Sequence, residues 1–219
     1  QTDGIGWIDT EYFYHGDAFP KTSRVRMEAY SEKLGRNPVG SAYASYSFFG
    51  TWDGVMTASR WHEEYLQVWH DFTKKNPGGG NNYSEGWVYT KADIVMEFDY
   101  LNAGLWMTVN GGERNTFWNA ELKVSSAVSG SSMYLFGVNG NNAPGYYRFN
   151  EFRVWETPDG ESETLAVDMV PCVSGGKAGV YDKVRNRVFL PKCAEGSVSE
   201  FTVPEWDMGF AQDFSHVEV

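Results

Sequence analysis

Short stretches of alternating hydrophobic and polar residues recur along most of the chain, separated by Gly, Asn, Asp and Ser. In the clearest stretch, residues 24–30, the side chains of Val25, Met27 and Ala29 fall on one face. Alternation with a period of two is typical of a strand with one buried face. The same reasoning predicts strands at 42–49, 54–61, 64–70, 94–100, 105–109, 133–138, 146–155, 164–171, 179–182 and 187–190.

Helical periodicity does not extend over more than about ten residues anywhere in the chain, so we predict no long helix. Many short strands with frequent turns are typical of a sandwich or a barrel. The Gly- and Asn-rich segment 76–82 has strand-like flanks on both sides, which makes it a loop rather than a linker. We therefore predict a single β-sandwich domain over residues 1–203. The C-terminal tail, residues 204–219, either docks on that domain or marks where a longer chain was cut.

The composition adds an excess of aromatic residues, which make up 16% of the 219 residues. Flat aromatic faces serve well in binding surfaces as well as in cores. The formal charge of −11, with no basic run longer than Lys74–Lys75, argues against nucleic acid and anionic lipid as partners. No stretch approaches the roughly 20 apolar residues of a membrane span. Because the chain starts at Gln1 rather than Met, we expect a removed leader and an exported protein, extracellular, at the cell surface or periplasmic.

The two cysteines, Cys172 and Cys193, lack the Cys-x-x-Cys spacing of a redox pair. No further Cys exists to complete a four-ligand metal site. The alternatives are a structural disulfide or two buried thiols. Both cysteines flank a short hairpin pattern, so they can meet if their strands are neighbours. Because exported proteins commonly carry disulfides, we predict that these two are bonded.

A series of motifs in the second half resembles a known family. The motifs are Ser132-Met-Tyr-Leu-Phe-Gly-Val-Asn139, Arg148-Phe-Asn-Glu-Phe-Arg-Val-Trp155, Val167-Asp-Met-Val-Pro-Cys172, Ala178-Gly-Val-Tyr-Asp182 and Arg187-Val-Phe-Leu190. They resemble a concanavalin-A-like, laminin-G-like domain found in surface and secreted proteins of gut and marine bacteria. In the first half, Trp7-Ile-Asp-Thr10, residues 24–28 and Phe48-Phe-Gly50 look like other motifs of that family.

The resemblance implies an all-β, two-sheet antiparallel jelly-roll sandwich that is part of a larger surface or secreted protein. It does not fix a function, because the motifs are core strands and turns. The chain departs from the family after residue 190, where Pro191-Lys-Cys193 replaces a Gly/Ser-rich stretch. The second cysteine at that point supports the predicted disulfide.

Glu97 and Asp99 are candidates for a glycosidase pair of carboxylates, since positions two apart on one strand share a face. The next position on that face is Leu101, where sandwich-fold glucanases carry a third acid. We therefore interpret this face as solvated. The opposite face then holds the core residues Ile94, Met96 and Phe98.

A lyase-type site would combine Arg26 and Glu28 with Gln67 and His70. The spacing places Gln67 and His70 on opposite strand faces, although both must converge on one substrate. We therefore predict no lyase site, and polysaccharide hydrolysis or cleavage on this scaffold remains an alternative.

The sequence does not decide whether the chain binds a metal ion. The four histidines, at positions 15, 62, 70 and 216, show no metal-ligand spacing. Asp53, Asp93 and Asp182 are available as oxygen ligands for a structural calcium ion.

The strongest functional signal is a cluster of aromatic and polar residues between positions 52 and 69, because sugars are bound by aromatic faces and fixed polar groups together. Tyr65, Gln67 and Trp69 alternate and so share one strand face, and Trp106 extends the surface from a strand expected to be a neighbour. The candidate ligand-binding residues are Trp52, Asp53, Arg60, Trp61, His62, Tyr65, Gln67, Trp69 and Trp106.

The sequence thus supports a non-catalytic carbohydrate-binding or adhesion domain, with a glycan or cell-surface ligand as its partner. An enzyme on the same scaffold and a structural or protein-interaction module of a larger surface protein are the alternatives.

Overall fold

A computed structural model describes residues 2, 6–15, 20–33, 45–51, 56–61, 65–70, 82–85, 91–102, 104–113, 115–116, 128–137, 143–144, 146–193, 198–202 and 212–213. The described residues form strands and turns and contain no helix. Consequently, the structure offers no helical segment there that could span a membrane.

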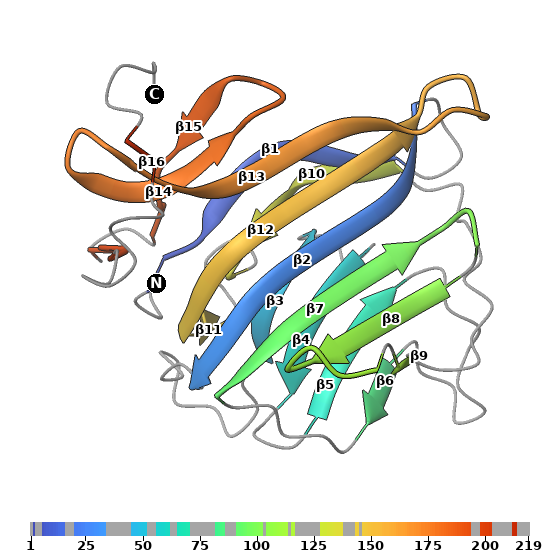
Figure 1. Cartoon of the computed structure of the whole chain (residues 1–219), viewed down its shortest axis with the longest axis horizontal. Helices are drawn as coiled ribbons and strands as arrows, with labels where there is room; N and C mark the ends of the chain where they lie inside the picture. The colour runs from blue at the N-terminus through green and yellow to red at the C-terminus, as the bar shows by residue number, and fades with distance from the viewer. Residues whose placement is uncertain are drawn as a thin grey trace.

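The described strands form two sheets that stack face to face (Figure 1). The seven-stranded sheet runs in the order β1 (Ile8–His15), β10 (Val128–Leu135), β3 (Ser45–Thr51), β4 (Met56–Trp61), β5 (Tyr65–His70) and β6 (Asn82–Glu85), with β11 (Ala143–Pro144) beside β3. The nine-stranded sheet runs in the order β15 (Arg187–Phe189), β14 (Lys177–Asp182), β13 (Thr164–Ser174), β12 (Tyr146–Thr157), β2 (Lys21–Lys33), β7 (Ala92–Asp99), β8 (Gly104–Val109) and β9 (Asn115–Thr116), with β16 (Gln212–Asp213) beside β13.

Neighbouring strands are antiparallel apart from the two short parallel additions, β11 and β16. The predicted all-β, two-sheet antiparallel sandwich is therefore confirmed. Because β16 belongs to the C-terminal tail, two residues of that tail pair with the sheet. The domain boundary at residue 203 stays a prediction.

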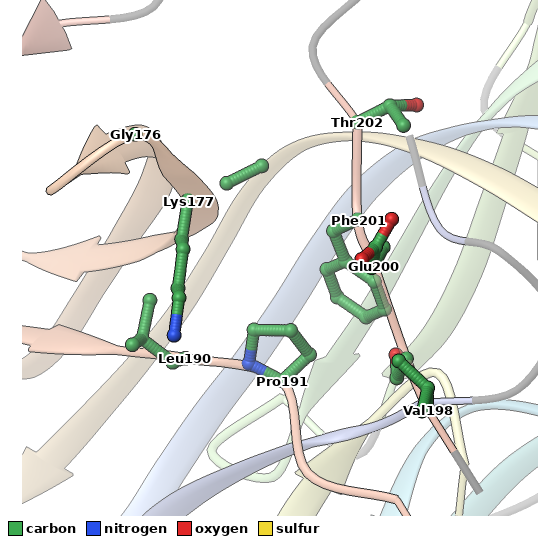
Figure 2. Close-up of a pocket in the computed structure, with 10 residues that line it drawn as sticks. Gly176, Lys177, Leu190, Pro191, Val198, Glu200, Phe201 and Thr202 are labelled. Carbon is green, nitrogen blue, oxygen red and sulfur yellow. The ribbon is translucent and has the colours of Figure 1, made fainter.

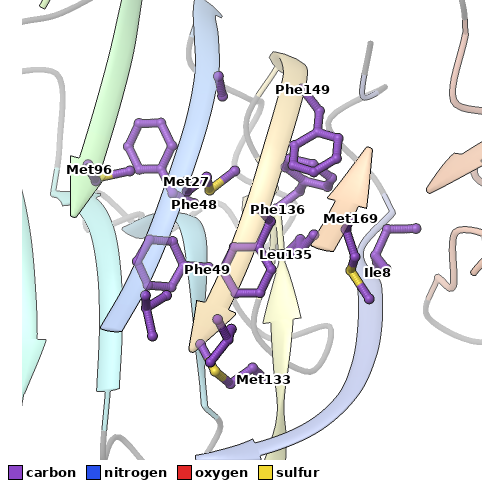
Figure 3. Close-up of a cluster of buried hydrophobic side chains, with 14 of the residues drawn as sticks. Ile8, Met27, Phe48, Phe49, Met96, Met133, Leu135, Phe136, Phe149 and Met169 are labelled. Carbon is purple, nitrogen blue, oxygen red and sulfur yellow. The ribbon is translucent and has the colours of Figure 1, made fainter. Parts of the chain in front are cut away.

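The core lies between the sheets and takes side chains from both. Figure 3 shows Ile8, Phe49 and Leu135 from the seven-stranded sheet against Met27 and Met96 from the nine-stranded sheet. All of them are buried. The alternation predicted for residues 24–30 is confirmed, since Val25, Met27 and Ala29 are among the buried side chains.

The predicted disulfide is wrong, because Cys172 and Cys193 are not joined in the structure. Cys172 lies on β13 and pairs with Gly179 on β14, and β14 separates β13 from β15. Cys193 follows β15, so two strand spacings, about 10 Å, lie between the chains that carry the two cysteines. A disulfide requires Cα atoms within about 7 Å. Burial raises the pKa of the Cys172 thiol to about 11, although a backbone hydrogen bond at Gly179 offsets part of the effect.

Candidate functional site

The outward side of the nine-stranded sheet carries charged and aromatic side chains on its central strands. We call this surface the ladder face. Its members are Arg24, Arg26, Glu28, Tyr30, Glu97, Trp106, Arg148, Glu151, Arg153, Trp155 and Asp168. Most alternate with buried residues of β2, β7, β8, β12 and β13, as the period of two in a strand requires. The sheet thus buries one side in the core and presents this side outward.

The centre of the ladder face is a pair of arginines held by acids. Arg26 and Arg153 lie directly opposite each other on β2 and β12, an arrangement of like charges that is destabilising on its own. Glu151 forms ion pairs with both, and its oxygen lies 2.9 Å from the Arg153 guanidinium. Asp168 lies 3.0 Å from the other side of Arg153. The acids therefore offset the repulsion and fix both guanidinium groups in place.

A β-bulge in β12 sets the geometry around Glu28. The register shifts between Phe149 and Glu151, so that the extra residue Asn150 lies beside Glu28 on β2. The Asn150 amide donates to Glu28 at 3.2 Å, and Arg26 donates to the same carboxylate at 3.0 Å. Glu28 is thus an acceptor group whose orientation is fixed by two neighbours.

Three partly exposed aromatic rings border the charged centre. The Arg24 guanidinium lies 4.0 Å from the centre of the Trp155 ring, and the Arg148 guanidinium lies 3.9 Å from the centre of the Tyr30 ring. Trp106 lies opposite Glu97 across β7 and β8. The ladder face therefore combines apolar rings with donors and acceptors held at fixed positions.

The carboxylates of Glu97 and Asp99 each contact a different neighbouring side chain. Asp99 is only 8% exposed, and its oxygens accept hydrogen bonds from the Asn102 backbone N–H at 2.9 Å and the Asn102 amide at 2.8 Å. It closes the turn after β7. Glu97 lies outward, 3.9 Å from Arg24, whereas Ile94, Met96 and Phe98 are buried as predicted.

A cavity of about 450 Å³ opens at the end of the β14–β15 pair (Figure 2). One wall comes from the start of β14 and the end of β15, and the other from residues 198–202. The cavity is lined by Gly176, Lys177, Ala178, Leu190, Pro191, Val198, Ser199, Glu200, Phe201 and Thr202. No residue of the predicted aromatic cluster lines it.

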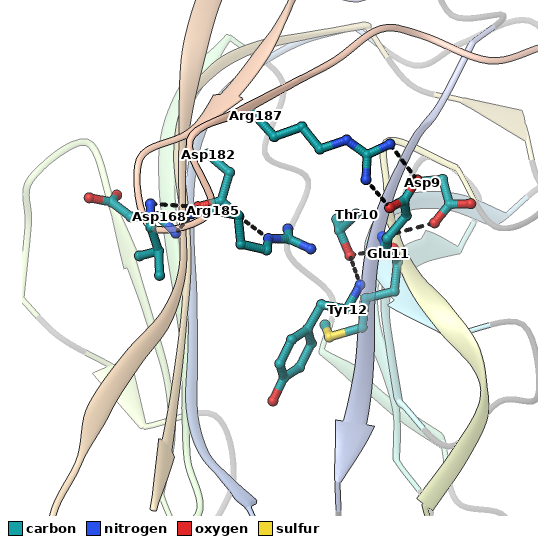
Figure 4. Close-up of polar contacts among 10 residues, drawn as sticks. Asp9, Thr10, Glu11, Tyr12, Asp168, Asp182, Arg185 and Arg187 are labelled. Carbon is teal, nitrogen blue, oxygen red and sulfur yellow. Dashed lines mark hydrogen bonds and ion pairs between the residues drawn. The ribbon is translucent and has the colours of Figure 1, made fainter. Parts of the chain in front are cut away.

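The described residues contain no group of three or more His, Cys, Asp or Glu side chains that could hold a metal ion. Asp182 is fully buried, and one oxygen accepts the backbone N–H groups of Asp168 at 3.2 Å and Val184 at 2.9 Å. Its other oxygen pairs with Arg185, as Figure 4 shows. Asp182 therefore stabilises the turn after β14. Asp93 is an exposed residue of β7, and Asp53 lies outside the described residues.

The six predicted binding residues that belong to described strands fall on two sheets. Trp52, Asp53 and His62 lie outside the described residues. Positions 60 and 61 belong to β4 and positions 65, 67 and 69 to β5, and the structure describes the strands there but not these side chains. Trp106 lies on β8 of the other sheet, so the prediction that it extends the same surface from a neighbouring strand is wrong. Alternation within a strand does not indicate which sheet the strand joins.

The same topology separates the residues of the lyase hypothesis. Arg26 and Glu28 point outward from β2 in the nine-stranded sheet, whereas β5, which carries positions 67 and 70, belongs to the seven-stranded sheet. These residues are not brought together.

Sequence reasoning missed most of the ladder face. Its members Arg148, Glu151, Arg153 and Trp155 belong to a motif that carries the family resemblance, and the outward positions of that strand are charged or aromatic. That composition of the polar face is a signal that the sequence does contain.

A scan of the sequence against protein-family models finds no match, and a search of curated proteins finds none either. Among solved structures, the chain is similar to a candidate carbohydrate-binding protein from Bacteroides ovatus ATCC 8483, with 18% identity and a TM-score of 0.45. The match covers 88% of this chain and 60% of that one, so the chain spans less than two thirds of that protein. The chain is also similar to Scytalido-glutamic peptidase, with 13% identity and a TM-score of 0.34, over 89% of this chain and 100% of that one. Similarities this low assign no activity to the chain.

Proposed function

We propose that the chain is a non-catalytic carbohydrate-binding domain and that the ladder face contacts the sugar. The observation that carries the proposal is the set of partly exposed rings around a cross-linked group of arginines and carboxylates. Sugar recognition needs apolar ring faces for C–H groups and polar groups in fixed positions for hydroxyls.

The polar groups of the ladder face are suited to hydroxyl recognition because they are held before a ligand arrives. Arg153 is anchored by Glu151 and Asp168 at 2.9 and 3.0 Å, and its side chain is 34% exposed. An anchored guanidinium loses less conformational freedom on binding than a mobile one. Its remaining N–H groups are donors for hydroxyl oxygens, and the neighbouring carboxylate Glu28, 33% exposed, is an acceptor.

The resemblance to concanavalin-A-like, laminin-G-like domains supports the same proposal, as does the two-sheet architecture. With that resemblance we propose an extracellular or cell-surface location within a larger protein. Adhesion to a cell-surface glycan is one form that such binding takes.

The test is a glycan-array screen followed by titration of the best ligand with two tryptophan variants. Trp106→Ala removes a ring from the ladder face, and Trp69→Ala is the matched control on the other sheet. We expect Trp106→Ala to weaken binding about tenfold or more and Trp69→Ala to leave it unchanged. Both variants must keep the thermal midpoint of the parent.

A reversed result, with loss only in Trp69→Ala, would move the site to the aromatic cluster on β4 and β5. An array without any binder, or release of sugars from a polysaccharide panel, would overturn the proposed function.

A further inference from the structure

We infer that the ladder face binds a linear chain of about four neutral sugar units, which lies along β2 and β12. This inference rests on the proposed function and adds the length and the charge of the ligand to it. Two observations carry it. The partly exposed rings of Tyr30 and Trp155 lie at opposite ends of one row of outward side chains. The arginines between them, Arg26 and Arg153, are already paired with acids.

The row is formed by two paired strands. Positions 24 to 30 of β2 alternate between outward and buried side chains and pair with β12 along this length. Trp155 lies opposite Arg24 at one end, and Arg148 lies opposite Tyr30 at the other. From position 24 to position 30, an extended strand rises by about 20 Å. The two rings therefore mark the ends of a strip of that length.

Each end of the strip is a flat, stacked pair. The Arg24 guanidinium lies 4.0 Å from the centre of the Trp155 ring, and the Arg148 guanidinium lies 3.9 Å from the centre of the Tyr30 ring. A guanidinium is planar and more weakly hydrated than an ammonium, so the stack suits the C–H face of a sugar ring. Because a single bond is about 1.5 Å long, each sugar unit adds about 5 Å to a chain, and about four units bridge the two ends.

The middle of the strip supplies polar groups at fixed positions. Arg26 and Arg153 are both paired with Glu151, and Glu28 accepts a hydrogen bond from Arg26 at 3.0 Å. Trp106 lines up with Arg26 across β7 and borders this middle part. A hydroxyl group both donates and accepts, so a neutral sugar can bond to a guanidinium and to a carboxylate at once. The middle of the strip therefore suits the hydroxyl groups of the central units.

The strip favours a neutral chain because its own charges cancel. The ladder face contains four arginines and four acidic residues. Lys183 and Glu163, which pair with members of the face, add one charge of each sign. An acidic sugar would compete with the carboxylates that already hold the arginines, and the remaining carboxylates would repel it. The formal charge of −11 on the whole chain adds to this repulsion.

The experiment measures how affinity depends on the length and the charge of the sugar chain. The probes are di-, tetra- and hexasaccharides of four neutral backbones (cellulose, xylan, mannan and amylose) and of two acidic ones (polygalacturonate and alginate). Any other linear backbone that binds on the glycan array is added, and each probe is titrated calorimetrically into the full chain.

We expect at least one neutral tetrasaccharide to bind about tenfold or more tightly than its disaccharide, because only the longer chain reaches both ends of the strip. The corresponding hexasaccharide should gain little more. The acidic tetrasaccharides should bind about tenfold more weakly than the best neutral one.

Variants at the two ends test the span. Tyr30→Ala and Trp155→Ala should each lower the affinity for the tetrasaccharide about tenfold, to that of the disaccharide, because one end no longer holds the chain. Tyr134→Ala, which removes a partly exposed ring from β10 of the other sheet, is the matched control and should change nothing. The length series on the parent protein tests the same span without any substitution.

Glu163→Gln tests the charge balance. Glu163 pairs with Arg24 at 3.0 Å, so its replacement leaves that guanidinium less compensated. The ratio of neutral to acidic tetrasaccharide affinity should fall about threefold or more at low salt, and an unchanged ratio would contradict the charge explanation.

The outcomes separate this inference from the proposed function. A disaccharide that binds as tightly as its tetrasaccharide would overturn the inferred span. An acidic series that binds as tightly as the best neutral one would overturn the inferred charge. Both results would leave glycan binding by the ladder face intact, whereas the absence of any binder on the array contradicts the proposed function itself.

Discussion

At the residue scale, two acidic side chains of β1 form polar contacts with the chain around β14 and β15. Asp9 accepts hydrogen bonds from the Ser132 hydroxyl at 2.6 Å, the Glu11 backbone N–H at 3.0 Å and the Lys192 ammonium at 3.0 Å. Next to it, Glu11 pairs with Arg187, as Figure 4 shows. Trp7 and Lys192 exchange backbone hydrogen bonds at the same place. These contacts tie the edge of one sheet to the chain that leaves the other.

Asp9 should make stability depend on pH in acid. Burial alone raises the pKa of Asp9, but the bonds from Ser132, Glu11 and Lys192 outweigh it and hold the pKa below the ordinary 3.8. Because the folded-state pKa is lowered, the carboxylate stabilises the fold at pH values above about 4. That contribution is lost as the pH falls through the lowered folded-state value.

We therefore expect Asp9→Asn to cost about 1 kcal/mol at pH 7 and progressively less below pH ~4. Urea denaturation of both proteins between pH 7 and pH 2.5 measures the difference. Ser132→Ala, which removes one donor but keeps the carboxylate, should show the same trend more weakly. A cost that stays constant across this pH range would contradict the assignment.

At the scale of the secondary-structure elements, β13, β14 and β15 form a meander. Its strand pairing depends on register and turn geometry. The Gly175–Gly176 turn has φ values of +55° and +75°, which Gly adopts without strain. In this register Val180 lies opposite Phe189 and Cys172 opposite Gly179. The close approach of β14 and β15 then depends on the absence of a side chain at position 179.

Gly179→Ala should loosen this meander. A Cβ at this position would lie 2.6 Å from the backbone oxygen of Phe189, a contact that only movement of β15 can relieve. We expect a loss of about 2 kcal/mol in the free energy of unfolding, measured by thermal and urea denaturation. Gly175→Asn is the control, because nothing lies within 4 Å of a Cβ there and Asn tolerates positive φ. Equal losses in the two variants would contradict the steric explanation.

The strand β2 could be predicted from the sequence, whereas β1 could not. β2 has apolar residues at each inward position, so periodicity reveals it. β1 was not predicted, although Tyr12 and Tyr14 point inward, because the inward position between Ile8 and Tyr12 is the polar Thr10. Its hydroxyl donates to the Met133 carbonyl at 2.7 Å, a partner 123 residues away that no local pattern reveals.

The candidate site was less predictable than the fold for the same reason. Trp106 was identified as a candidate, but the strand that carries it pairs with β7 rather than with β4 or β5. The alternation of residues predicts a strand and its two faces, whereas sheet order depends on long-range pairing. The predicted disulfide failed on this point as well, since the hairpin pattern did not reveal that β14 separates the two cysteines.

At the scale of the whole molecule, aromatic side chains make up much of the core that packs between the two sheets. Among the described residues, Phe48, Phe49, Phe98, Phe136, Tyr147 and Phe152 are nearly or fully buried. The aromatic excess in the composition therefore serves the core to a large extent, and Trp106 and Trp155 are the described tryptophans that remain partly exposed. Both of these tryptophans lie on the ladder face.

Phe49 provides the sharpest test of a single shared core. It comes from β3 of the seven-stranded sheet and contacts Phe98 and Phe152 of the nine-stranded sheet, with ring centres 5.3 and 5.7 Å apart. Phe49→Ala leaves a cavity between the sheets and should cost about 3–5 kcal/mol in the free energy of unfolding. Phe13→Ala is the matched control, because Phe13 is 45% exposed and its loss should cost less than about 1 kcal/mol.

Urea denaturation followed by both tryptophan fluorescence and far-UV circular dichroism should give one coincident transition, since each sheet buries its apolar face only against the other. Separate transitions, or similar costs at positions 49 and 13, would mean that the two sheets do not share one cooperative core.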